Sequence, residues 1–196
     1  PTPISVNMSR LHFNDDDLPN KLVSLLNKYN LPRHMLELEL TESAFFANEP
    51  RLVRLMNELR AAGFVFSMDD FGTGYSSLST LRDLPFSVVK LDRAFISDGT
   101  TNRRGQIVAR NTIALAHDLD MSIVAEGVET KEHARFLLNS GCNCAQGFYY
   151  SRPVDTAEFE VLCFVQEKAF WVHPRIKEDA IRLGLPISTE APVREY

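Results

Sequence analysis

Residues 64–95, FVFSMDDFGTGYSSLSTLRDLPFSVVKLDRAF, allow the rest of the chain to be interpreted. An apolar run at the start of this stretch predicts a buried strand, and two adjacent carboxylates, Asp69 and Asp70, end that strand. A glycine-rich turn and a short helical piece follow, and a second apolar strand carries Lys90 and leads to Asp92. Such acids beside a glycine-containing loop, with a lysine on the next strand, are typical of metal ligands at the carboxyl edge of an α/β sheet. A solvated turn of two aspartates is the alternative interpretation.

The composition limits the class of protein. With 196 residues, of which 44% are hydrophobic and 24% charged, the chain is long enough for one globular domain with a substantial core. A net charge of −5 argues against duplex nucleic acid as a partner. The chain starts at Pro1 rather than Met, so we expect it to derive from a longer protein. The odd number of cysteines (Cys142, Cys144 and Cys163) without CxxC spacing predicts inert, reduced thiols and a cytoplasmic protein.

The segment from Met35 to Thr41, MLELELT, alternates strictly between leucine and glutamate. This pattern predicts a strand with Glu37 and Glu39 on one face and leucines on the other. In a half-exposed strand the glutamates would meet water. In a barrel the same alternation would point the leucines at surrounding helices and the glutamates into the lumen.

Strand and helix patterns alternate along the whole chain, which predicts parallel strands joined by right-handed crossovers. We expect an α/β fold of the TIM-type (β/α) barrel class with about six of eight strands, and a doubly wound open sheet is the alternative. The expected strands are 3–9, 35–41, 64–66, 86–91, 121–125 and 144–149. The expected helices are 18–29 (with Leu22, Leu25 and Leu26 on one side), 49–62, a short piece near 78–84, 106–118 (with Ile107 in the core) and 130–140, while 101–105 is expected to be a polar loop.

Polar side chains fall at or near the carboxyl ends of these strands, where a barrel would bring them into one pocket. They are Asn7, Glu39, Asp69, Asp70, Lys90, Glu126 and Gln146. Oxygen ligands of this kind select hard divalent ions such as Mg²⁺ or Mn²⁺, and adjacent aspartates suit two ions that act on a phosphate. Lys90 would position or deprotonate a water molecule, or would form a structural ion pair with Asp69 or Asp92.

Six segments together resemble the EAL family of bacterial cyclic di-GMP phosphodiesterases, in the family's order. They are SVNMS (5–9), ELELTES (37–43), MDDFGTGYSSL (68–78), VVKLDRAFI (88–96), VAEGVET (124–130) and CAQGFYYSRPV (144–154). The resemblance implies hydrolysis of one phosphodiester bond of cyclic di-GMP, with two Mg²⁺ or Mn²⁺ ions, to give the linear dinucleotide pGpG. It also implies a homodimer, and upstream sensory or GGDEF-type domains in a longer protein that a membrane can anchor.

The resemblance assigns roles residue by residue. The implied metal ligands are Asn7, Glu39, Asp69, Asp70 and Glu126. The implied catalytic group consists of Lys90, Glu126, Gln146 and Glu42, the last of which would anchor the loop 70–75. The implied substrate-binding residues are Ser9, Asp92 and Arg152.

One departure from the family pattern affects the expected activity. The Glu-Ala-Leu motif that names the family is absent, and the two remaining barrel strands would precede Pro1. We therefore expect residues 1–170 to form a barrel truncated at its N-terminus, 171–196 to form an extension, and the chain alone to turn over substrate weakly or not at all. Two other functions remain open: a cyclic di-GMP sensor with impaired catalysis, and a Mg²⁺-dependent barrel enzyme that acts on another phosphate or an enolate.

Overall fold

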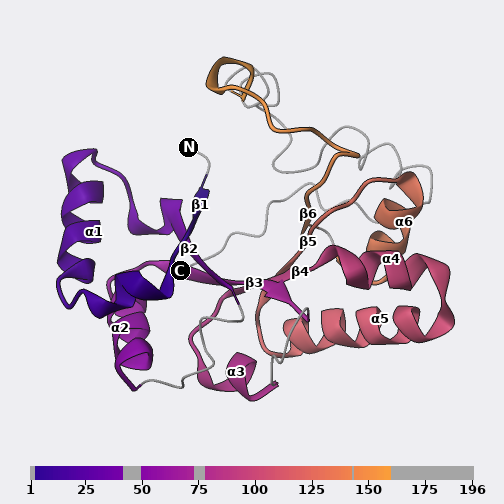
Figure 1. Ribbon diagram of the computed structural model, residues 1–196, viewed down its shortest axis with the longest axis horizontal. Helices are drawn as coiled ribbons and strands as arrows, with labels where there is room; N and C mark the ends of the chain where they lie inside the picture. Colours follow the sequence, from indigo (N-terminus) through magenta and orange to yellow (C-terminus); the bar gives the residue numbers. More distant parts are fainter. Residues whose placement is uncertain (1–2, 42–49, 73–77, 143, 160–196) are drawn as a thin grey trace. The chain divides into compact units, whose positions relative to one another are not determined.

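The computed structural model describes residues 3–41, 50–72, 78–142 and 144–159 (Figure 1). Its strands form one sheet in sequence order, and every pair whose register is defined is parallel. The strands are β1 (Ile4–Asn7), β2 (Leu36–Thr41), β3 (Val65–Phe71), β4 (Val88–Leu91), β5 (Ser122–Ala125) and β6 (Cys144–Ala145). Sequential parallel strands with helices between them are the topology of a (β/α) barrel, so the predicted fold class, a barrel with six of its eight strands, is confirmed.

Helices follow the strands, with two short 3₁₀ turns near the start. They are η1 (Arg10–Asn14), α1 (Leu18–Lys28), η2 (Arg33–Met35), α2 (Pro50–Ala61), α3 (Leu78–Asp83), α4 (Arg93–Thr101), α5 (Arg103–Asp118) and α6 (Lys131–Asn139). The chain divides into two compact units. The first contains residues 1–92 and 114–123, and the second contains residues 93–113 and 124–196. Within the described residues, none of the helices is both long and apolar enough to cross a membrane.

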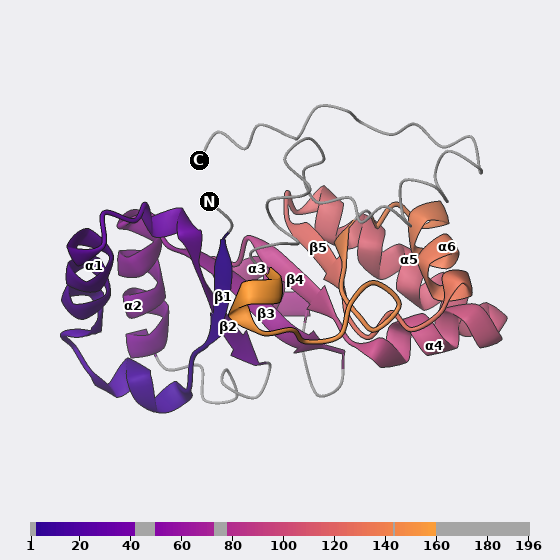
Figure 2. The same ribbon diagram turned by 90° about the horizontal axis from the view of Figure 1, so that it is seen from above.

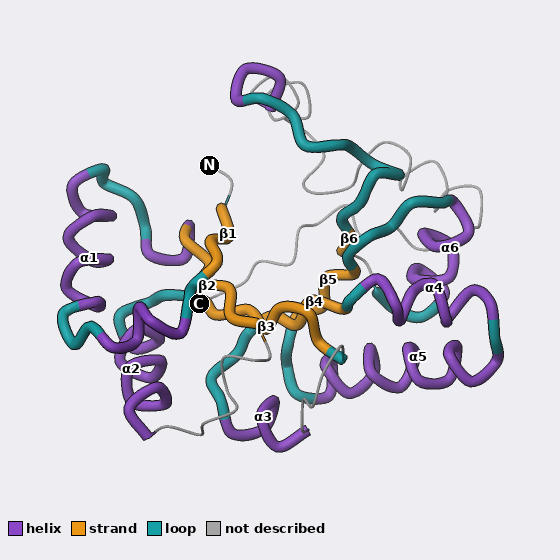
Figure 3. Tube along the Cα trace, viewed as in Figure 1, coloured by secondary structure: helices purple, strands orange, loops and turns teal. Residues whose placement is uncertain are grey.

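The core of the first unit lies on the helix-covered face of β2 to β4. Leu38, Leu40 and Phe66 on this face are completely buried. Helix α2 supplies the predicted apolar stripe, in which Leu52, Leu55, Met56 and Leu59 are buried. Figure 2 shows α1 and α2 side by side, and Figure 3 shows the strands β1 to β4 following one another in chain order. The expected alternation in β2 is confirmed, because the leucines take the core face and leave the glutamates to the other.

Glycines end two helices as their positions in the sequence predict. Gly63 follows α2 with a φ of 98°, and Gly141 follows α6 with a φ of 87°. The amide of Phe64 bonds the carbonyl of Leu59 across the first of these turns. A left-handed backbone is unstrained only for glycine, so these residues let the chain leave each helix and enter the next strand.

The predicted polar loop 101–105 is wrong, because α4 and α5 leave only Asn102 between them. The side-chain oxygen of Asn102 accepts a hydrogen bond from the amide of Gly105 at 2.6 Å, so it caps the first turn of α5. The Thr101 hydroxyl bonds the carbonyl of Ser97 at 2.8 Å, within α4. Polar residues that suggested a loop therefore satisfy the backbone groups of two helix ends.

One predicted core residue is exposed, and so is one leucine expected on the apolar side of α1. Ile107 on α5 is 51% exposed, because the buried face of that helix follows Ala109, Ile113 and Ala116, and a residue two positions from Ala109 lies on a different face. Leu25 on α1 is 49% exposed, whereas its neighbour Leu26 is buried. In both helices an apolar residue lies beside the buried stripe and not within it.

The last strand is shorter than expected. β6 contains only Cys144 and Ala145, and Gln146 and Gly147 lie beyond it. At Gly147 the chain has a φ of 155° and passes so close to the backbone of Val128 that a side chain would collide with it. The close approach requires glycine and ends the regular strand.

Some expectations fall outside the described residues. These are Glu42, residues 73–75 of the loop 70–75, Cys163, residues 160–170 of the expected barrel, and the extension 171–196.

Truncating a core leucine should destabilise the chain far more than truncating an exposed isoleucine on α5. We expect Leu40→Ala to lower the free energy of unfolding by about 2–5 kcal/mol, because it leaves a cavity at a completely buried site. Ile107→Ala should change it by no more than about 0.5 kcal/mol. Urea unfolding followed by circular dichroism measures both, and equal losses would contradict the assignment of buried faces.

The Cys142 thiol should resist alkylation. Burial raises the pKa of Cys142 to about 12, and its Sγ contacts the carbonyl of Cys144 at 3.3 Å. Since the thiolate is the nucleophile, iodoacetamide at pH 8 should label the exposed Cys144 first and Cys142 only after unfolding or as the pH approaches 12. Mass spectrometry of peptides from the chain and from a Cys144→Ser variant measures this, and rapid native labelling of Cys142 would refute it.

Candidate metal and catalytic site

The strand register of the first unit brings the predicted polar residues together. Asn7 on β1 lies opposite Glu39 on β2, and Thr41 on β2 lies opposite Asp69 on β3. Side chains two residues apart on a strand share a face, so Glu39 lies on the face of Thr41, opposite to that of Leu38 and Leu40. The alternation that buries leucines against helices therefore also gathers oxygen ligands on the inner face.

Lys90 links these carboxylates. Its ammonium Nζ lies 2.8 Å from Glu39 Oε1 and 3.4 Å from Asp69 Oδ1. Only 8% of Lys90 and 6% of Glu39 is exposed. Charged groups this deeply buried need partners of opposite sign, because burial removes their hydration. Of the two partners considered for a structural ion pair of Lys90, Asp69 or Asp92, the structure shows Asp69. The pair with Glu39 is an addition that the sequence did not indicate.

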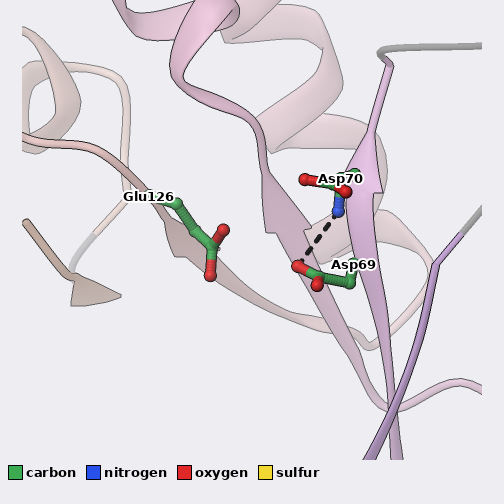
Figure 4. Close-up of side chains that lie close together, drawn as sticks. All are labelled: Asp69, Asp70 and Glu126. Atoms are coloured by element: carbon green, nitrogen blue, oxygen red, sulfur yellow. Dashed lines mark hydrogen bonds between the residues drawn. The ribbon is translucent and has the colours of Figure 1, made fainter. Parts of the chain in front are cut away.

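An irregularity in β3 orients the two aspartates. The pairing of β3 with β4 shifts register between Met68 and Phe71, and Asp70 has a left-handed φ of 54°. Its amide donates a hydrogen bond to the Asp69 carboxylate at 3.1 Å, and Figure 4 shows both carboxylates on the same side of β3. Consecutive side chains in a regular strand point to opposite faces, so the bulge lets both face one side.

The half-buried position of Asp69 and its ion pair with Lys90 argue against the alternative of a solvated turn. A left-handed non-glycine residue costs of the order of 1–3 kcal/mol, and such strain is concentrated at functional sites. Aspartate is among the side chains that tolerate this conformation best.

Ser67 is a polar residue of this face that sequence reasoning missed. It lies opposite Glu39 in the strand register and is completely buried, and its hydroxyl has no hydrogen-bond partner within the described part of the chain. The signal that would have identified it is its position two residues before Asp69 in a run of apolar residues, since alternation places it on the same face.

The second unit presents its own pair of predicted site residues. Glu126 follows β5, and Gln146 follows β6 and donates a hydrogen bond from Nε2 to Glu126 Oε1 at 2.9 Å. The pairing of β5 with β6 continues beyond the strands, because the amide of Gln146 bonds the carbonyl of Ala125 at 2.8 Å. The structure thus confirms that these two side chains meet.

The predicted substrate-binding residues have different surroundings. Asp92 is half-buried directly before α4. Arg152 is exposed, and its guanidinium carbon lies 4.5 Å from the centre of the Phe148 ring. The Ser9 hydroxyl accepts from the Leu11 amide at 3.3 Å and so caps η1. The structure therefore gives Ser9 a local structural role, and its predicted contact with substrate stays a prediction.

The donor set fits a hard divalent cation. Every candidate ligand offers a carboxylate or amide oxygen, which is the chemistry that Mg²⁺, Mn²⁺ and Ca²⁺ prefer. The carboxylates of Glu39 and Asp69 hold the ammonium group of Lys90, so this face already accommodates a positive charge.

Comparison with known proteins identifies the family. Residues 1–153 match the model of the EAL domain. Over 157 residues, the chain is 39% identical to the cyclic di-GMP phosphodiesterase NbdA of Pseudomonas aeruginosa, a match that covers 80% of this chain and 20% of NbdA. The chain spans about a fifth of the length of several curated relatives that it matches.

Solved structures agree with this assignment. The EAL domain of Mycobacterium smegmatis DcpA aligns with a TM-score of 0.77 at 35% identity, over 82% of this chain and 72% of that one. Klebsiella pneumoniae BlrP1, in a complex described as containing manganese and cyclic di-GMP, aligns with a TM-score of 0.73 at 29% identity, over 77% of this chain and 39% of BlrP1. The chain belongs to the EAL domain family.

Proposed function

We propose that this chain contributes the catalytic site of a phosphodiesterase that hydrolyses one phosphodiester bond of cyclic di-GMP to give pGpG. The observation that carries the proposal is the buried cluster in which Lys90 bridges Glu39 and Asp69, in a chain of the EAL family. The name of NbdA and the cyclic di-GMP in the BlrP1 complex supply the substrate class.

Five residues would hold two divalent ions, Mg²⁺ or Mn²⁺. They are Asn7, Glu39, Asp69, Asp70 and Glu126. When bound, the ions supply an activated water and positive charge for the phosphate. The manganese in the BlrP1 complex supports a divalent ion, and the adjacent aspartates on one side of β3 support a paired site.

The remaining site residues would bind the substrate or orient the groups that react with it. Lys90 would hold the attacking water and add positive charge where negative charge develops on the phosphate. Gln146 would keep the Glu126 carboxylate in place through its hydrogen bond. Asp92 and Arg152 would contact the substrate, with Arg152 well suited to an anionic or planar group because it is exposed and stacks on a ring.

A sensor that binds cyclic di-GMP without hydrolysing it is the second candidate. It shares the fold and the binding site, and it differs in the absence of turnover. The described metal and catalytic positions carry carboxylate, amide and lysine side chains that can act, which favours catalysis. The homodimer expected from the sequence stays a prediction.

Removing one charge at the aspartate pair should abolish turnover without unfolding the protein. In the full-length protein that contains this chain, we expect Asp69→Asn and Asp70→Asn each to reduce kcat at least about 100-fold. A loss of this size is typical when an essential metal ligand or the group that supports it is removed. Asparagine suits position 70 because it tolerates a left-handed backbone. Liquid chromatography of pGpG measures the rate.

The matched control is Asp83→Asn, which removes an exposed carboxylate paired with Arg82. Its activity should equal that of the unaltered protein. In differential scanning fluorimetry, Mn²⁺ should raise the melting temperature of the unaltered protein and of this control. The increase should be smaller for the two site variants. Full activity of Asp69→Asn would refute the metal assignment.

Lys90→Met should make the protein depend on metal for stability. It leaves the buried Glu39 carboxylate without its ammonium partner, which should cost about 3–5 kcal/mol in metal-free buffer. Mn²⁺ should restore part of that stability and leave kcat low. Chemical unfolding with and without Mn²⁺ measures the difference, and an unchanged metal-free stability would show that the ion pair does not support the fold.

A further inference from the structure

The segment 127–130, which directly follows Glu126, is held at several points within the second unit. On one side, the amide of Val128 bonds the carbonyl of Gln146 at 3.0 Å, and the carbonyl of Val128 accepts from the amide of Tyr149 at 2.9 Å. Val128 is completely buried. At its end, the Thr130 hydroxyl caps α6 by accepting from the amide of His133 at 3.2 Å.

Arg93 holds the same segment at another point. Its two terminal nitrogens reach the two carboxylate oxygens of Glu129 at 2.9 and 3.1 Å, which is a two-pronged pairing with fixed geometry. The aliphatic part of Arg93 passes directly over Gly127: a Cβ at position 127 would lie 2.8 Å from the Cβ of Arg93. Gly127 itself has a left-handed φ of 68°.

Exposure alone would make this a minor ion pair, since Arg93 is 59% and Glu129 36% exposed and such pairs contribute little to stability. Its location argues for a different role. Arg93 is the first residue of α4 and lies three positions after Lys90, while Glu129 lies three positions after Glu126. The pair therefore ties the chain that leaves β4 to the chain that leaves β5.

We propose that the pair of Arg93 and Glu129 is a positioning device for the Glu126 carboxylate, and hence for the metal ion that Glu126 would bind. The proposal rests on the proposed function, in which Glu126 is a ligand. Groups that orient a metal ligand from behind affect metal affinity and activity by about 10-fold to 100-fold when removed. Neither Arg93 nor Glu129 touches the reacting atoms in this proposal.

The test uses the full-length protein and the variants Arg93→Met, Glu129→Gln and Arg93→Lys. Arg93→Met keeps the aliphatic stem over Gly127 and removes the fork, and Arg93→Lys restores one charged donor. The first two should raise the Mn²⁺ concentration for half-maximal hydrolysis about 10-fold. KM for cyclic di-GMP should stay unchanged, and saturating Mn²⁺ should recover most of kcat. For Arg93→Lys, the Mn²⁺ concentration for half-maximal hydrolysis should lie between the values for the unaltered protein and for Arg93→Met.

The double variant Arg93→Met/Glu129→Gln should be no worse than either single variant, because the two residues act as one unit. The matched control is Arg82→Met, which breaks another two-pronged arginine–carboxylate pair, with Asp83 at 2.7 and 2.9 Å. It should leave the Mn²⁺ dependence unchanged.

Electron paramagnetic resonance of Mn²⁺ binding, without substrate, separates this inference from the proposed function. If the unaltered protein binds Mn²⁺ but hydrolyses nothing, the proposed function fails while weaker Mn²⁺ binding by Arg93→Met still supports the positioning role. If Arg93→Met and Glu129→Gln match the unaltered protein in Mn²⁺ dependence and affinity, the positioning role is refuted. A lower melting temperature with unchanged Mn²⁺ affinity would also refute it, because it would show an ion pair that only stabilises the fold.

Discussion

The burial of one ammonium group between two carboxylates is the constraint on which the site depends. Lys90 on β4 lies within reach of Glu39 on β2 and Asp69 on β3, on strands that belong to one parallel sheet. None of these charges would be stable alone in such a position, since each would lose its hydration without compensation. The register of β2, β3 and β4 is therefore tied to the chemistry, because a shift of any one of these strands by one residue would move its charge to the leucine face.

In this arrangement, one face of the sheet carries the side chains that stabilise the fold, and the opposite face carries the candidate functional side chains. The side chains that point toward the helices, among them Leu38, Leu40 and Phe66, are completely buried and apolar. The other face carries the carboxylates of Glu39 and Asp69, with the ammonium group of Lys90 between them. At Asp70 the chain also accepts a left-handed backbone, and this strained position places a second carboxylate beside the first.

Much of this could be predicted from the sequence, because the determining patterns are local. Strict alternation in residues 35–41 predicted β2 and its two faces, and apolar spacing predicted α2 and its stripe. The prediction from sequence failed where a polar residue is common both in loops and at helix ends: the residues around Asn102 cap helices instead of forming a loop. It also missed the bond between Lys90 and Glu39, which depends on register between strands far apart in the chain, and the close approach at Gly147, which depends on the neighbouring backbone.

The most direct test of the central claim is an anomalous-scattering map from crystals of the full-length protein soaked in Mn²⁺. The account predicts manganese peaks within coordination distance, about 2.0–2.4 Å, of the carboxylates of Asp69 and Asp70, with Glu39 among the ligands and Lys90 displaced from at least one of its partners. Manganese bound elsewhere, with Lys90 still paired to Glu39 and Asp69, would contradict it.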